Sequence, residues 1–161
     1  MPRMNLMKPC IALGWLVVLA GVNLFTAAIS AEPPTIAGRQ TKNIAGWTVL
    51  VSDELLAKDK ETTERALTLL AVQLEEITWG VPAAAVAELR KVPLWISPEY
   101  PGVPPRAEYH PDAGWLREHR RDPAMERAVE FSNVRTFERE TKRMPNFVLH
   151  EVAPAYHDRV L

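Results

Sequence analysis

The residues best suited to chemistry lie near the end of the sequence, where His150-Glu151 is followed by Val152, Ala153 and Pro154. Residues four positions apart share one face of a helix, so the two histidines of an H-E-x-x-H segment can bind one Zn²⁺. The glutamate of that segment then serves as general base for the zinc-bound water. Here Pro154 takes the place of the second histidine. The spacing therefore matches the first half of such a motif at His150 and Glu151, whereas most His-Glu pairs on helices are surface or packing residues.

Other histidines could replace the missing ligand. His157 lies seven residues after His150, about 700° around a helix and about 10.5 Å along its axis. Two Zn–N bonds of about 2.1 Å do not span that distance comfortably on a straight helix. Pro154 costs a helix roughly 3 kcal/mol or kinks it, and a kink would bring His157 closer to His150. His110 and His119 are two further candidates, but we expect both to be loop or surface histidines.

The motif must be positioned by a helix, and the sequence around it has the features of one. Pro145 and Asn146 are typical of a helix start. An apolar face follows, made of Phe147, Val148, Leu149 and Val152. These side chains need a surface on which to pack.

Apolar periodicity upstream predicts the elements that provide this surface. A β-branched strand is expected at 47–51, with Trp47, Val49 and Val51 on one face. A long helix is expected from Asp53 or Asp59 to Trp79, ended by Gly80. One face of that helix is lined by apolar residues and is expected to pack on the protein's own sheet. These residues are Leu67, Leu70, Leu74 and Ile77.

The second half of the chain predicts shorter elements. A short helix is expected at 82–90, and a strand at 92–96 in which Pro93 marks either the start or a sheet edge. The proline-rich segment 97–112 fits no regular element, whereas 129–134 is a weak strand candidate. The charged segment 138–143 is expected to form a solvated face. This order of elements predicts an α+β fold, a small sheet with packed helices that ends in the helix carrying His150.

The first 31 residues have the three-part pattern of a secretory signal peptide. Arg3 and Lys8 precede an uncharged apolar run, 10–25, and small residues lead to Ala31. An uncleaved membrane anchor is the alternative, but the apolar run of 16 residues is short for a span. We therefore expect export to the periplasm or the extracellular space, without membrane attachment after removal of the leader. A disordered linker is expected at 32–45.

Removal of residues 1–31 leaves 130 residues, enough for one domain at 46–161. It also removes two of the 19 basic residues and none of the 20 acidic ones, so the remaining chain carries a net charge of −3. This charge argues against a protein that binds nucleic acids through a basic surface. The only cysteine, Cys10, lies in the leader, which excludes disulfides and cysteine-ligated metals from the exported chain.

Taken together, residues 46–161 resemble a family of secreted bacterial zincin-like metallopeptidases. The resemblance rests on the segments 92–98, 107–111, 114–116 and 129–134, and above all on 144–147 leading into the His-Glu helix. In that family the helix reads H-E-L-A-H-A-Y-H-D. The resemblance implies that His150 is the first zinc ligand, that Glu151 is the general base, and that Pro154 occupies the place of the second ligand. His157 and Asp158 match the family, with His157 in a supporting position beside the ligands.

The resemblance also implies a defect. The family continues beyond the position of Leu161 and takes its third ligand, a carboxylate, from a later helix. We therefore expect the C-terminal part of the zincin-like domain to be missing, Zn²⁺ not to be stably bound, and peptidase activity to be absent. Truncation is also expected to leave apolar surface of the final helix exposed and the domain marginally stable.

The sequence thus predicts an exported homologue of enzymes that cleave a peptide or protein substrate, itself catalytically defective. Two alternatives remain open. The first is a non-catalytic exported binding module, and the second is a truncated gene product without function. Capture of a specific partner by the folded, metal-free protein would favour the first alternative.

Overall fold

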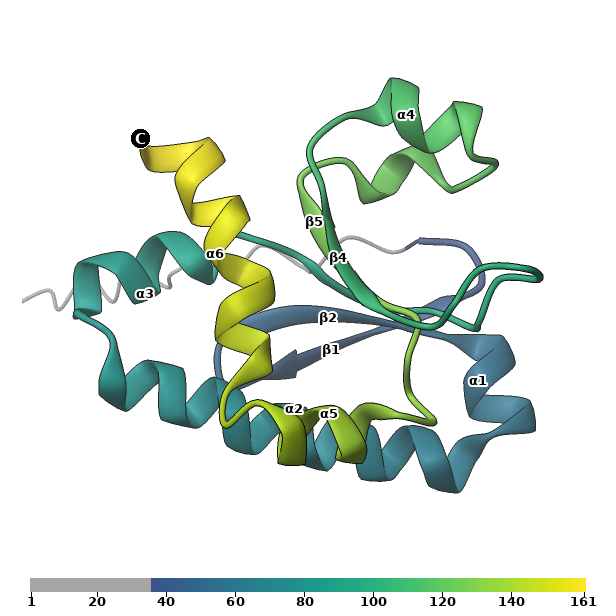
Figure 1. The fold of residues 1–161 in the computed structure, drawn as a ribbon, viewed down its shortest axis with the longest axis horizontal. Helices are drawn as coiled ribbons and strands as arrows, with labels where there is room; N and C mark the ends of the chain where they lie inside the picture. The colour runs from purple at the N-terminus through teal and green to yellow at the C-terminus, as the bar shows by residue number, and fades with distance from the viewer. Residues whose placement is uncertain (1–35) are drawn as a thin grey trace, which may run out of the picture. The chain divides into compact units, whose positions relative to one another are not determined.

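A five-stranded mixed sheet carries the fold, with the strand order β1-β2-β3-β5-β4 (Figure 1). The computed structural model describes residues 36–161. The strands are β1 (Arg39–Ile44), β2 (Trp47–Ser52), β3 (Leu94–Ile96), β4 (Ala107–His110) and β5 (Ala128–Phe131). The three central strands are parallel, and β1 and β4 each run antiparallel to the neighbouring strand. The predicted signal peptide, 1–31, and the start of the predicted linker lie outside the described residues.

Six α-helices and one short 3₁₀-helix connect and cover these strands within residues 36–161. They are α1 (Asp53–Lys58), α2 (Lys60–Gly80), α3 (Ala83–Leu89), α4 (Ala113–Glu118), η1 (Pro123–Met125), α5 (Phe137–Arg143) and α6 (Phe147–Val160). The predicted α+β fold, a small sheet with packed helices, is thereby confirmed. The long helix after β2 is also confirmed, as two helices that meet at Asp59. None of the helices in this part of the chain combines the length and apolar character that crossing a membrane requires.

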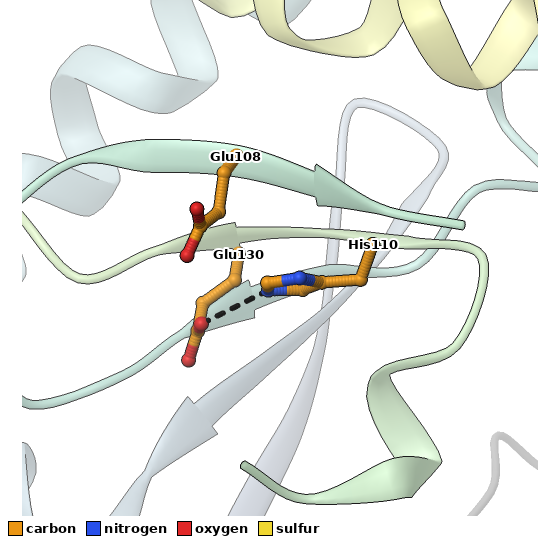
Figure 2. A group of neighbouring side chains, drawn as sticks. All are labelled: Glu108, His110 and Glu130. Atoms are coloured by element: carbon orange, nitrogen blue, oxygen red, sulfur yellow. Dashed lines mark hydrogen bonds and ion pairs between the residues drawn. The ribbon is translucent and has the colours of Figure 1, made fainter. Parts of the chain in front are cut away.

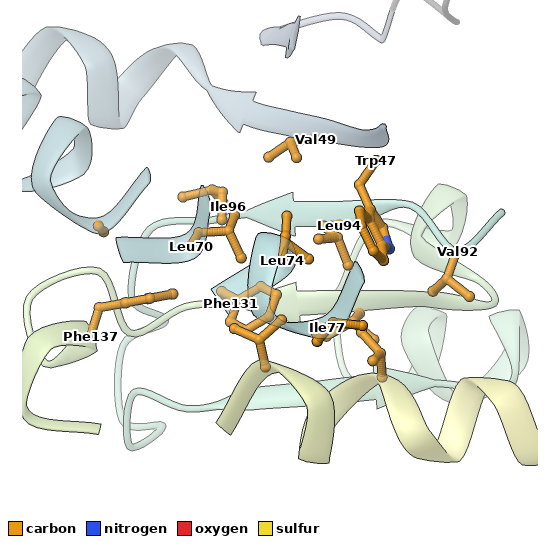
Figure 3. Close-up of a cluster of buried hydrophobic side chains, with 14 of the residues drawn as sticks. Trp47, Val49, Leu70, Leu74, Ile77, Val92, Leu94, Ile96, Phe131 and Phe137 are labelled. Carbon is orange, nitrogen blue, oxygen red and sulfur yellow. The ribbon is translucent and has the colours of Figure 1, made fainter. Parts of the chain in front are cut away.

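The main core lies between one face of the sheet and the helices α2, α5 and α6 (Figure 3). Alternate strand residues point toward it because successive side chains of a strand face opposite sides. Trp47, Val49, Val51, Leu94 and Phe131 are all buried there. The apolar face of α2 packs on the sheet as predicted, with Leu70, Leu74 and Ile77 buried and Leu67 partly buried.

Helix α6 contributes to the same core. Phe147, Val148 and Val152 are at most 2 % exposed. The expectation that this apolar face would remain exposed is therefore wrong for the three residues. The aromatic rings of Phe137 and Phe147 meet edge to face, 4.8 Å apart, and anchor the start of α6 against α5.

A second, smaller core lies on the other face of the sheet. It contains Leu50 of β2, Trp95 of β3 and Ala128 of β5, covered by Leu116 of α4 and Met125 of η1. The segment that carries α4 and η1 therefore forms a separate cover, on the face of the sheet that α2 and α6 leave free (Figure 1).

The structure corrects two expectations about irregular segments. Residues 39–44 of the expected disordered linker form β1, and residues 107–110 of the proline-rich segment form β4. Both are edge strands, which gain backbone hydrogen bonds without the apolar alternation that marks a half-buried strand. A tight turn sets the register of β1 on β2, because Ala45 and Gly46 have φ values of 50° and 91°.

Candidate functional site

Hydrogen bonds to α2 fix the first turn of α6. The Asn146 side chain accepts a hydrogen bond from the Leu149 N–H at 2.9 Å, which makes Asn146 the N-cap at the predicted helix start. Its amide group donates to the backbone oxygen of Gln73 at 3.1 Å and to Glu76 at 3.0 Å. The buried side-chain oxygen of Gln73 accepts from the Val148 N–H at 3.0 Å. The start of the helix that carries His150 and Glu151 is thereby held against α2.

Helix α6 presents its histidines on the side opposite the core. His150, Pro154 and His157 are exposed, whereas Val148, Val152 and Ala155 are buried. The helix continues through Pro154 as far as Val160. Positions 150, 154 and 157 therefore form one exposed stripe, with imidazoles at its two ends and a proline between them.

Glu151 is half-buried beside this stripe. It lines a cavity of about 150 Å³ together with Asn133, Glu140, Arg143 and residues 105–107. Burial raises the pKa of Glu151, repulsion from Glu108 and Glu140 adds to the effect, and the charge of His150 opposes it. A carboxyl group with a raised pKa holds its proton more tightly than an ordinary glutamate, which is a property that acid–base catalysts share.

A hydrogen bond joins α6 to the edge strand β4. The Tyr109 hydroxyl donates to Asp158 at 2.8 Å. Burial raises the pKa of Tyr109 to about 12, and the hydrogen bond to Asp158 adds to this effect. The phenol therefore remains a donor throughout the physiological range, and it ties the second half of α6 to the strand.

The two further histidine candidates do not join the α6 stripe. His119 is exposed, as predicted, and its ring stacks on Trp115 at 3.9 Å between centroids. His110 is only 2 % exposed, so the expectation of a loop or surface histidine is wrong for this residue. It ends β4 and points to the face of the sheet opposite the α6 side, because Tyr109 packs against the main core.

His110 belongs to a polar cluster that the sequence did not reveal, shown in Figure 2. Glu108 and Glu130 are cross-strand partners on β4 and β5, and His110 lies two positions farther along β4. The Nε2 atom of His110 is 3.1 Å from Oε2 of Glu130, and the Tyr100 hydroxyl donates to the other oxygen of Glu130 at 2.6 Å. A single clue was available, since Glu130 interrupts the apolar strand Val129-Glu130-Phe131.

Arg121 supplies the balancing charge in this cluster. Its Nη1 atom donates to Glu130 and lies 3.1 Å from Oε1 of Glu108, and its guanidinium stacks on the ring of Tyr100 at 3.9 Å. A second arginine, Arg106, pairs with the other oxygen of Glu108 at 2.8 Å. The cluster therefore joins the proline-rich loop, the sheet and the segment between α4 and η1.

The cluster keeps Glu130 ionised. Burial alone would raise the pKa of this carboxyl group. Hydrogen bonds from His110, Ser97 and Tyr100, together with the charge of Arg121, outweigh burial and leave the pKa of Glu130 below its ordinary value.

This lowered pKa predicts a pH dependence of stability. A group whose pKa is lower in the folded state stabilises the fold above its unfolded value, about 4.3, and loses this contribution as the pH falls through the folded value. We expect the free energy of unfolding of wild type to exceed that of Glu130→Gln near neutral pH. The difference should shrink below about pH 4.3. Urea denaturation across this range measures it, with the exposed Glu126→Gln as control. A difference that does not change with pH would contradict the prediction.

Known proteins offer no guide to either group of residues, since neither a family model, nor a curated protein, nor a solved structure matches the chain.

Proposed function

We propose that residues 46–161 are an exported, zincin-like relative of metallopeptidases in which the zinc site on α6 is incomplete. The observation that carries this proposal is the exposed stripe of α6. His150 and the position four residues later are both open to solvent, and the half-buried Glu151 lies beside them. This is the arrangement of side chains that an H-E-x-x-H helix requires, apart from the identity of residue 154.

The residues of α6 do not fit a catalytic zinc ion. Such an ion needs three protein ligands and one open position. Helix α6 supplies one imidazole at His150 and a proline ring at 154. His157 lies about 10.5 Å farther along the helix axis. No hydrolytic step is therefore assigned to this chain, and its relation to metallopeptidases is proposed as one of descent.

The cavity beside Glu151 favours a second candidate, a binding module without hydrolysis. Asn133, which lines this cavity, is 2 % exposed and its Oδ1 atom has no hydrogen-bond partner within residues 36–161. A buried oxygen without a partner is costly. A ligand that brings an N–H donor into this region would remove that cost, and a peptide carries such donors.

Restoring the missing ligand tests the main proposal. The purified protein without a histidine tag is compared with Pro154→His and Pro154→Ala by zinc titration. We expect Pro154→His to bind Zn²⁺ at least roughly tenfold more tightly than wild type, while Pro154→Ala does not gain affinity. The gain should disappear in Pro154→His combined with His150→Ala. Equal zinc affinity in Pro154→His and Pro154→Ala would contradict the proposed helix geometry.

Activity of the wild-type protein is the second part of the test. We expect no stoichiometric zinc after dialysis and no cleavage of a mixed peptide library. One zinc ion per chain together with turnover that Glu151→Gln abolishes would overturn the proposal of an incomplete site.

A further inference from the structure

The polar cluster on the other face of the sheet contains a set of metal-ligand groups that α6 does not share. One ligand atom each of Glu108, His110 and Glu130 lies within 4.8 Å of the other two (Figure 2). Glu108 and Glu130 face each other across the β4–β5 pair, and His110 extends from the same side of β4. The sheet therefore brings two carboxylates and one imidazole together on rigid strands.

These groups suit a divalent transition metal. Imidazole and carboxylate are both ligands of Zn²⁺, and three protein ligands leave a fourth position open. Two ligand atoms bound to one tetrahedral ion at about 2.1 Å are roughly 3.4 Å apart. The 3.1 Å between Nε2 of His110 and Oε2 of Glu130 is close to this separation. His110 and Glu130 are at most 2 % exposed, and the Glu108 side chain is partly exposed although its Oε1 atom is buried.

Arg121 occupies the position between the carboxylates. Its Nη1 atom contacts Oε2 of Glu130 and Oε1 of Glu108, the two oxygens that face the centre of the cluster. The contact with Glu108 is an ion pair without hydrogen-bond alignment, and this buried oxygen has no other partner within residues 36–161. On this side, Glu108 is therefore held only by its ion pair with Arg121. A metal cation would hold the same carboxylate by charge as well.

We propose that Glu108, His110 and Glu130 form a Zn²⁺ site that the guanidinium of Arg121 closes. The guanidinium and the metal ion compete for the same two carboxylates, because either one neutralises them. Arg121 lies between α4 and η1, outside the strands that hold the three ligands. Exchange of the arginine for the ion therefore requires the Arg121 side chain to leave the cluster, while Leu116 and Met125 of the same segment stay packed in the small core.

The experiment replaces Arg121, the competitor of the ion, and measures the binding of Zn²⁺ as the only metal added. All variants carry His150→Ala, so that zinc bound at α6 does not contribute to the measured affinity. The result therefore does not depend on whether the proposal for α6 is correct. We expect Arg121→Gln to bind one Zn²⁺ at least roughly tenfold more tightly than the parent, as measured by titration and by metal content after dialysis. Arg121→Lys, which keeps the positive charge, should remain like the parent. Adding His110→Gln to Arg121→Gln should abolish the gain.

Folding of Arg121→Gln is followed by circular dichroism with and without zinc, because the variant removes the positive charge that Glu108 and Glu130 share, and Arg106 compensates Glu108 alone. A variant that folds only when zinc is present supports the proposal, since the ion then supplies the missing charge. A variant that remains unfolded in excess zinc overturns it. So does a folded variant that gains no zinc affinity, or a gain that persists without His110.

Discussion

Replacing Pro154 with alanine is expected to raise the free energy of unfolding by about 3 kcal/mol. Helix α6 continues through this position to Val160, and a proline there cannot donate a hydrogen bond to the carbonyl of His150. The ring of Pro154 is exposed, so its removal takes nothing from the core. Urea denaturation of the two proteins, followed by circular dichroism, measures the difference.

The neighbouring exposed residue Ala153 provides the matched control. Ala153→Gly should lower the free energy of unfolding by about 1 kcal/mol if α6 is a regular helix at this point. A gain of only a few tenths of a kcal/mol for Pro154→Ala would indicate that the helix already accommodates the proline. The zinc titration of Pro154→His would then test a helix of different shape.

Replacing Arg121 with methionine is expected to lower the free energy of unfolding by about 3–5 kcal/mol. The guanidinium is the buried positive charge that contacts both Glu108 and Glu130. Its loss leaves two carboxylates facing each other on one side of the sheet. It also removes the stacking contact with Tyr100 that connects the proline-rich loop to this cluster.

Two further variants separate charge from packing. The exposed Arg117→Met on α4 should change the stability by no more than about 0.5 kcal/mol. Adding Glu130→Gln to Arg121→Met should recover part of the loss, because the uncompensated charge is then removed. A loss below about 1 kcal/mol for Arg121→Met would contradict the view that this arginine neutralises the cluster.

The elements that face the main core could be predicted from the sequence because their apolar residues repeat with the period of the element. Strand β2 and helix α2 are examples, with Val49 and Val51 on one side of the strand and Leu70 and Leu74 on one face of the helix. The start of α6 could also be predicted, since Pro145 and Asn146 are helix-start residues and the helix begins at Phe147. These features depend on residues close together in the sequence.

Features that depend on distant residues could not be predicted in the same way. Strands β1 and β4 lie at the sheet edges, where backbone pairing to a neighbour replaces apolar periodicity. The polar cluster combines Tyr100, Glu108, Arg121 and Glu130 from four separate segments, so no local spacing marks it. The sequence predicts that His150 and Glu151 lie on one helix. Their exposure and the cavity beside Glu151 depend on how α6 packs against the rest of the fold, which local sequence does not specify.

The parallel arrangement of the three central strands has a consequence for the rate of folding. Val49, Leu94 and Val129 lie side by side in the sheet although long segments of chain separate them. Each pairing requires closure of a long loop before any stabilising contact forms, which slows folding relative to a helical protein of the same length. During this delay the edge of the apolar strand Trp47–Ser52 that later pairs with β3 is open to pairing with another copy of the chain. Aggregation during refolding should therefore increase with protein concentration, even though the same strand lies in the interior of the finished sheet.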